Sequence, residues 1–204
     1  MKMNRFAALA LAVSFSGFLT FQSFAEDDHS HAASHDHESM QQRETKITEA
    51  LSALSPQDQK LAAAQRFCPV MTYDRLGSMG TPVKMMVGGK PVFLCCEACQ
   101  DEANADPTKT LKTVDKLKES TAELAKLPME TRAKVEAQKY CAVINKSLLG
   151  SMGVPIALEI DGKPVYLCCA GCTKRAQADP AGTLAKAEKL VEAGEHHGHE
   201  HDHK

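Results

Sequence analysis

The residues best suited to chemistry are eight cysteines, which form two sets with the same spacing. Each set has two adjacent cysteines, a third shortly after them and a fourth well upstream. The first set is Cys68, Cys95, Cys96 and Cys99, and the second is Cys141, Cys168, Cys169 and Cys172. Thiolate sulfur binds zinc, copper(I) and other thiophilic ions, and the two-residue gap between Cys96 and Cys99 is common in structural zinc sites. The spacing therefore indicates two soft-metal sites.

The same cysteines are compatible with two other kinds of chemistry. In an oxidising compartment, an even number of cysteines also indicates disulfides, which would staple a scaffold for protein contacts. The C-x-x-C pairs at 96–99 and 169–172 resemble those at helix starts in thiol–disulfide oxidoreductases, although no βαβ pattern surrounds them.

All nine histidines lie outside residues 38–195. The usual general base is therefore missing from the body of the chain, and we expect no enzyme activity.

The two cysteine sets belong to a tandem repeat. Shifting the chain by 73 positions aligns residues 64–117 with 137–190 without a gap, with 26 identities in 54 pairs. The four cysteines of each set align, as do the Gly-Ser-Met-Gly turns at 77–80 and 150–153. A duplication of this kind predicts two copies of one structural unit.

Each copy predicts a short β-hairpin that ends at the adjacent cysteines. In the first copy, the β-prone segments 83–87 and 90–94 flank a Gly-Gly pair. The second copy has Asp-Gly at the matching turn, which is a stronger signal for a two-residue hairpin turn. The upstream cysteine of each set would reach the site from the loop before the hairpin.

Helices are predicted on both sides of each hairpin. Ser55 before Pro56, with Asp58 three residues on, marks one helix start. Asp106 and Asp179 each precede a proline and would cap a further helix. A helix that begins near the adjacent cysteines would favour their thiolate form, because its free N–H groups attract negative charge. The predicted fold class is α+β, with two small hairpins, surrounding helices and helical connectors.

The order of residues in each copy resembles the TRASH/YHS heavy-metal-binding domains. These pair an upstream cysteine with a downstream C-x3-C and a following D-P, as do Cys68, Cys95, Cys99 and Asp106. Members are implicated in trafficking, resistance and sensing of heavy metals, and they adopt a small treble-clef-like zinc-finger fold. The resemblance covers roughly 50 residues of each copy and implies two tandem treble-clef-like metal-finger modules. The ligands it implies are Cys68, Cys95 and Cys99, with Cys141, Cys168 and Cys172.

Two departures from the family pattern leave the fourth ligand open. Many members have a second cysteine close to the first, whereas none follows Cys68 or Cys141 at short range. The family's small polar residue after the first downstream cysteine is here Cys96 or Cys169, and we expect these to be the fourth ligands. Spacing alone favours Cys96 over Cys95 as the main ligand, whereas the resemblance favours Cys95.

Met79 and Met152 occupy matching positions in the two copies. A thioether at this position could bind copper beside the thiolates. Methionine is more often a packing residue in a turn or core, and that is the more common expectation.

The rest of the chain is assigned from composition. Residues 1–25 have the basic start, apolar run and small-x-small pattern of a signal peptide, which predicts a periplasmic or secreted protein without stable membrane insertion. Segments 26–45 and 192–204 are polar and hold all nine histidines, and we expect them to be disordered. Their imidazoles suit weak capture of zinc, nickel or copper. The metal-binding repeats then span 46–118 and 119–191.

The mild negative charge of the chain completes the prediction. A formal net charge of −2 without tryptophan lacks the basic footprint of a nucleic-acid-binding protein. The sequence therefore predicts an exported protein that binds, buffers or delivers thiophilic metal ions, zinc or copper(I), with its His-rich tails assisting. A metal transporter or metallochaperone is its expected partner. The alternatives are a periplasmic thiol–disulfide redox protein and a disulfide-stapled scaffold.

Overall fold

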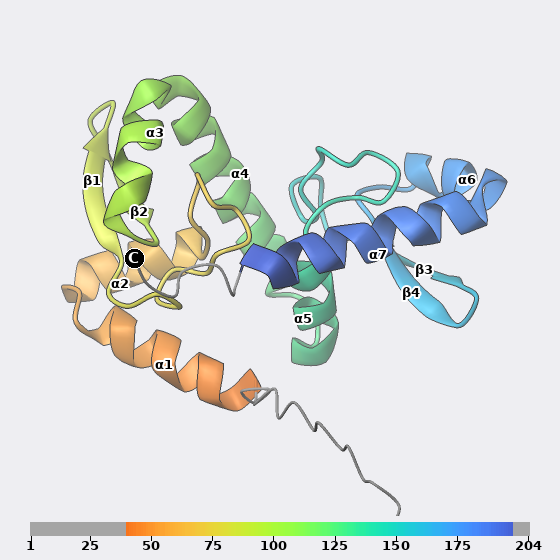
Figure 1. Cartoon of the computed structure of the whole chain (residues 1–204), viewed down its shortest axis with the longest axis horizontal. Helices are drawn as coiled ribbons and strands as arrows, with labels where there is room; N and C mark the ends of the chain where they lie inside the picture. The colour runs from red at the N-terminus through yellow and green to blue at the C-terminus, as the bar shows by residue number, and fades with distance from the viewer. Residues whose placement is uncertain (1–39, 198–204) are drawn as a thin grey trace, which may run out of the picture. The chain divides into compact units, whose positions relative to one another are not determined.

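The repeated sequence folds into nearly the same order of elements twice (Figure 1). The computed structural model describes residues 40–197. The first half contains α1 (Met40–Ser52), α2 (Pro56–Gln65), β1 (Val83–Val87), β2 (Lys90–Leu94), the short 3₁₀ helix η1 (Glu97–Cys99), α3 (Gln100–Ala105) and α4 (Pro107–Leu124). The second half contains α5 (Met129–Gln138), β3 (Ile156–Ile160), β4 (Lys163–Leu167), α6 (Gly171–Ala178) and α7 (Pro180–His197). The α+β class is as predicted.

The predicted helix starts are confirmed by their caps. Ser55 accepts a hydrogen bond from the Asp58 N–H at 3.2 Å, and Pro56 opens α2. At the start of α4, Asp106 accepts from the Lys109 N–H at 2.9 Å. Asp179 makes the matching contact with the Gly182 N–H at 3.0 Å, before α7. Each cap satisfies an N–H group that the first helical turn leaves unpaired.

The two hairpins are separate two-stranded antiparallel sheets, with strand bounds as predicted. Their registers match, since Val83 pairs with Leu94 as Ile156 pairs with Leu167. Both turn residues of each hairpin have positive φ, including Asp161 at 51°. This is the backbone of a type I′ turn, whose twist matches that of the flanking strands. The shared register places the adjacent cysteines at the same end of each hairpin.

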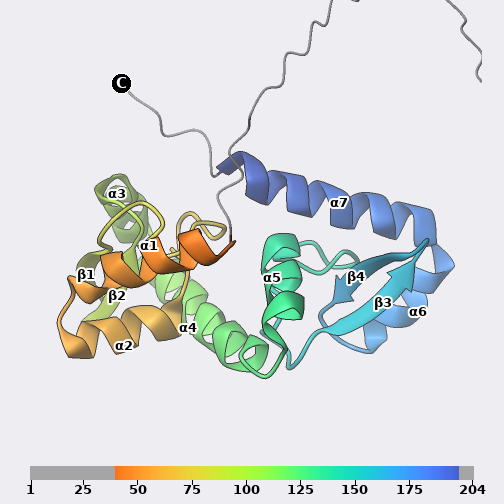
Figure 2. The same cartoon turned by 90° about the horizontal axis from the view of Figure 1, so that it is seen from below.

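Each hairpin has its own buried core, and α4 runs between the two cores. The first core includes Val92, Phe93 and Leu94, and the second includes Val165, Tyr166 and Leu167. Val114 of α4 belongs to the first core, whereas Leu124 belongs to the second. Figure 2 shows α4 leading from the first hairpin towards α5. The predicted repeat boundary between residues 118 and 119 therefore falls inside a helix that both halves use.

A small third cluster joins the two halves. Phe67, Leu117 and Leu148 form it, with Tyr140 packed against them. Beside it, the Arg66 guanidinium makes a two-point ion pair with Glu136, at 2.6 and 2.8 Å. The described residues accordingly all belong to one compact unit. Among residues 40–197, no helix combines the length and apolar character needed to cross a bilayer.

The expectation of disorder is wrong for the inner ends of both polar segments. Residues 40–45 lie in α1, and 192–197 lie in α7. Tertiary contacts explain the difference, because the turn at Gly77 packs closely on Ile47 of α1. Composition alone does not register such contacts, which supply most of the stability of short helices. The predicted signal peptide and seven of the nine histidines lie outside the described residues.

Candidate metal centre

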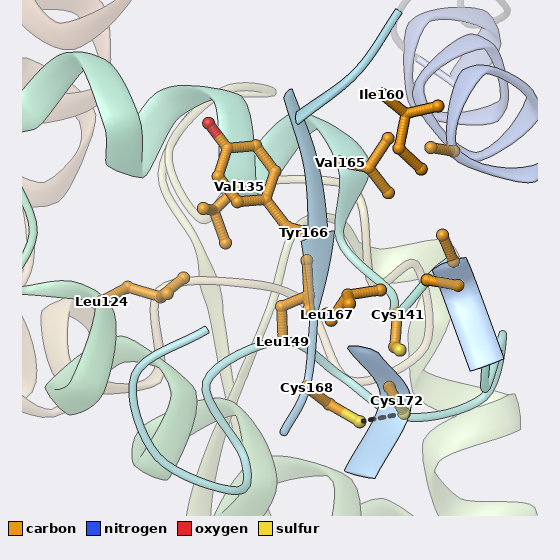
Figure 3. Close-up of a cluster of buried hydrophobic side chains, with 13 residues drawn as sticks. Leu124, Val135, Cys141, Leu149, Ile160, Val165, Tyr166, Leu167, Cys168 and Cys172 are labelled. Atoms are coloured by element: carbon orange, nitrogen blue, oxygen red, sulfur yellow. Dashed lines mark hydrogen bonds between the residues drawn. The ribbon is translucent and has the colours of Figure 1, made fainter. Parts of the chain in front are cut away.

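Three buried cysteine sulfurs converge in each half. The groups are Cys68, Cys95 and Cys99, and Cys141, Cys168 and Cys172. Within each group all sulfurs lie within 4.8 Å of one another, and each residue is at most 4% exposed. Figure 3 shows Cys141, Cys168 and Cys172 gathered at one end of the second core. None of the eight cysteines forms a disulfide.

The upstream cysteine of each set is positioned by a short loop that folds back on itself. The Cys68 N–H donates to the Asp74 carbonyl at 3.0 Å, and the Cys141 N–H donates to the Ser147 carbonyl at 2.9 Å. The two loops therefore share one backbone frame. This frame brings a sulfur that is distant in sequence to the end of the hairpin.

A buried glutamine ties this loop to the hairpin. The Gln65 amide donates to the Phe67 carbonyl at 2.9 Å and to the Phe93 carbonyl at 2.6 Å, and its oxygen accepts from the Phe93 N–H at 3.0 Å. Gln138 makes the same three contacts with Tyr140 and Tyr166. Both side chains are almost completely buried. The glutamine thus fixes the spacing between the upstream cysteine and the strand before the adjacent cysteines.

The sulfur spacing matches that of a thiolate metal site. The Sγ atoms of Cys95 and Cys99 lie 3.7 Å apart, and so do those of Cys168 and Cys172. Thiolates bonded to zinc at about 2.3 Å in a tetrahedron lie about 3.8 Å from one another. The downstream sulfurs therefore need almost no movement to share one ion. Copper(I) uses the same soft donors, so the sulfur types suit either ion.

Cys96 and Cys169 lie at the edge of the buried groups. The Cys96 sulfur is 3.9 Å from those of both Cys95 and Cys99, whereas Cys169 is 4.0 Å from Cys168. Both are half-buried, unlike the other six cysteines. Cys95 rather than Cys96 joins the buried group, so the C-x3-C spacing describes the convergent sulfurs better than the C-x-x-C spacing does.

The first group is electrostatically prepared to hold one negative charge. A hydrogen bond from the Cys95 thiol lowers the pKa of Cys68 to about 6, and backbone N–H groups of Cys95, Met71 and Val70 add to the effect. The same contact raises the pKa of Cys95, and burial raises that of Cys99 to about 12. The lowered pKa of Cys68 beside the raised pKa values of Cys95 and Cys99 favours a single thiolate, at Cys68. A bound cation would release the protons of the other two.

The second group shows the same pattern more weakly. Burial acts to raise the pKa of Cys141, but backbone N–H groups, led by that of Cys168, lower it overall. Burial raises the pKa values of Cys168 and Cys172. The half-buried Cys169 has a lowered pKa, chiefly because the Gly171 backbone N–H donates to its sulfur. In the second group the pKa is thus lowered at one buried and one half-buried sulfur, Cys141 and Cys169.

The surroundings of the two groups differ at one matched position. In the first half, Asp74 is 8% exposed and its carboxylate lies 4.0 Å from the Cys95 sulfur. In the second half the same backbone position holds Ser147, which acts to lower the pKa of Cys168 against the effect of burial and whose hydroxyl lies 3.7 Å from the Met152 sulfur. Met79 and Met152 are 40% and 60% exposed. Of the two placements expected, a turn or a core, the exposed fractions favour the turn for both methionines.

Sequence reasoning named all six convergent cysteines but missed Gln65, Gln138 and Asp74. The glutamines had a usable signal, because they and the alanines before them are the only aligned identities in α2 and α5. Asp74 had none, since only the folded loop brings it to a sulfur.

Known proteins add no further guide to the site. Comparison with family models, with curated proteins and with solved structures finds no significant match to this chain.

Proposed function

We propose that this protein binds thiophilic metal ions, zinc or copper(I), at two cysteine centres and works as an exported metal-buffering or metal-delivery protein. The single observation that carries the proposal is the convergence of three buried sulfurs in each half. Each centre would use Cys68, Cys95 and Cys99, or Cys141, Cys168 and Cys172. The half-buried Cys96 and Cys169 would supply the fourth sulfur.

An odd number of buried sulfurs favours metal over disulfides. The three buried sulfurs can form at most one disulfide among themselves, so full pairing would require the half-buried Cys96 or Cys169 to bond with the third. A metal ion uses all three at once, and their spacing already approaches that of a thiolate site. The protein's contribution is to hold the sulfurs in place and to keep water from them.

The half-buried cysteines suit exchange of the metal with a partner. Cys96 contacts two buried sulfurs from the solvent side. An ion held by the three inner sulfurs could exchange its bond to the Cys96 sulfur for a bond to a thiolate of a metal transporter or metallochaperone. The repeated hairpin and helix after the adjacent cysteines fit a pair of treble-clef-like modules of the TRASH/YHS kind. The His-rich ends would collect ions for the two centres.

Thiol–disulfide exchange is the second candidate, and Cys169 is the observation that favours it. Its pKa is lowered and it is half-buried near the start of α6, as in redox-active C-x-x-C pairs. Catalysis of other kinds has no support, because no histidine lies among residues 38–195. We therefore propose a binding protein in preference to an enzyme.

Metal content and thiol count together test the proposal. The full chain is purified under reducing, non-denaturing conditions, loaded with Zn²⁺ or anaerobically with Cu⁺, and desalted. We expect one ion for each cysteine centre, and all eight thiols free after chelation and unfolding. The Cys68→Ser/Cys141→Ser double variant keeps the His-rich ends and serves as the control for metal bound outside the centres.

The contrary outcomes are distinct. Equal metal binding by the double variant would assign the metal to the tails and overturn the proposal. Reversible two-electron oxidation of the thiols with no bound metal would support the redox function instead.

A further inference from the structure

We propose that Asp74 makes the first cysteine centre more selective for divalent zinc over monovalent copper than the second centre, where Ser147 occupies the same position. This inference rests on the proposed function and assigns a metal preference to each centre. Its basis is one side-chain difference within two loops of matching backbone. The two centres of one chain would then hold different ions when both are supplied.

The matched position is defined by hydrogen bonds that do not involve the side chain. The Cys68 N–H donates to the Asp74 carbonyl, as the Cys141 N–H donates to the Ser147 carbonyl. The loops enter through equivalent bridges, Phe67 with Arg75 and Tyr140 with Leu148. In the first half the side chain at this position lies 4.0 Å from the first sulfur after the hairpin, and in the second half it influences the pKa of the matching sulfur, that of Cys168. This side chain is a carboxylate in one half and a hydroxyl in the other.

Asp74 carries its negative charge in a buried setting. The residue is 8% exposed, so water screens it poorly. Its charge also reaches the buried amine of Lys139, where it supports the protonated form. The carboxylate oxygen lies 4.0 Å from the Cys95 sulfur. Any ion held by that sulfur consequently lies in the field of the carboxylate.

Charge then discriminates between the two ions. Three thiolates around Cu⁺ leave a centre one unit more negative than the same thiolates around Zn²⁺. A nearby buried carboxylate makes both complexes more negative, but it opposes the copper complex more. At short range in a poorly screened site, one unit of charge difference corresponds to about a tenfold or larger change in relative affinity.

The second centre has an uncharged side chain at the matched position. The Ser147 hydroxyl carries no charge, and it donates a hydrogen bond to the exposed Met152 thioether, at 3.7 Å. The second centre therefore lacks the carboxylate charge that disfavours Cu⁺ at the first.

The test isolates each centre in the full chain. Cys168→Ser/Cys172→Ser leaves only the first centre, and Cys95→Ser/Cys99→Ser leaves only the second. Affinities for Zn²⁺ and, anaerobically, Cu⁺ are measured by competition with a chromophoric chelator for each ion. Within these backgrounds, Asp74→Asn and Ser147→Asn place the same neutral side chain at both centres, and Ser147→Asp moves the charge to the second.

We expect a zinc-to-copper affinity ratio about tenfold or more higher at the first centre than at the second. Asp74→Asn should lower the first ratio by about that factor, whereas Ser147→Asp should raise the second and Ser147→Asn should leave it within about twofold. All variants should still bind one ion at the remaining centre.

An unchanged ratio in both Asp74→Asn and Ser147→Asp, on chains that still bind metal, overturns this inference alone. If the unsubstituted chain binds neither ion through its cysteines, both the proposed function and this inference are overturned. Because Ser147→Asp adds a charge, it tests the idea even where Asp74→Asn impairs folding of the first half.

Discussion

The first and second halves of this protein build the same sulfur arrangement on the same backbone, yet they surround it differently. Strand register, loop closure and glutamine contacts are repeated almost without change. The residues next to the sulfurs are not, because a carboxylate faces Cys95 where a hydroxyl faces Cys168. The comparison separates what a cysteine centre needs to form from what adjusts its chemistry.

The largest expected effect comes from removing one buried sulfur. Cys99→Ser should abolish metal binding at the first centre and leave the second nearly intact, since each half supplies its own ligands. Cys172→Ser should do the reverse. Metal content per chain, measured after loading and desalting, should fall by half in either variant. Equal loss from both centres would show that the two groups work as one, and would break the comparison.

Replacing a buried glutamine should weaken either half by a similar amount. Gln65→Leu keeps the side-chain volume but leaves the Phe93 N–H and carbonyl without their partner. We expect a loss of about 3 kcal/mol in the free energy of unfolding, measured by denaturant titration. Gln138→Leu should cost about the same, for the same reason. Gln177→Leu, on the exposed face of α6, is the control and should change stability by less than about 0.5 kcal/mol.

The matched residues Lys139 and Arg66 differ in their surroundings, at a site away from the sulfurs. They occupy matching positions of positive φ directly after α5 and α2. Arg66 is paired with Glu136, whereas the Lys139 amine lies 2.8 Å from the centre of the Phe67 ring. Burial, aided by Arg66 and Arg75, holds the pKa of Lys139 well below its usual value of 10.5. The ring face favours the ammonium form, but complete burial outweighs it.

The sign of the resulting pH dependence follows from proton counting. Between the lowered folded-state pKa and 10.5, the unfolded chain holds a proton at Lys139 that the folded chain lacks. The contribution of this group to stability therefore rises with pH across that window. Lys139→Met should be more stable than the unsubstituted chain at neutral pH, with a gain that shrinks towards pH 10. A constant difference across this range, measured by denaturant titration, would contradict the assignment.

The smallest expected effect lies in the hairpin turns. Asp161 has φ of 51° where the first hairpin has Gly88 at 55°. Asp161→Gly removes the strain of a side chain in this conformation, but it also raises the entropy of the unfolded chain. The two effects are similar in size, so the free energy of unfolding should change by less than about 0.5 kcal/mol. A larger change would show that the Asp161 side chain has a role that the first hairpin lacks.

Local signals were read correctly from the sequence where one residue acts on its neighbours. The caps at Ser55, Asp106 and Asp179 and both hairpin turns depend on contacts within about four residues, and all are confirmed. The limits of the helices were harder to predict. Residues 40–45 are polar by composition, but α1 is held by its contact with the turn at Gly77. The repeat boundary between 118 and 119 lies within α4, which carries side chains for both cores.

The sequence by itself determined that there are two equivalent sets of four cysteines, each beside a hairpin of fixed register. Repetition and short-range turn chemistry are sufficient for that. Only the tertiary structure decided which three sulfurs of each set are buried together, and that Cys95 rather than Cys96 joins them. It also decided that Asp74 faces one centre and Ser147 the other. These outcomes depend on how loops and strands distant in sequence pack against each other, and the spacing of residues along the chain does not determine that packing.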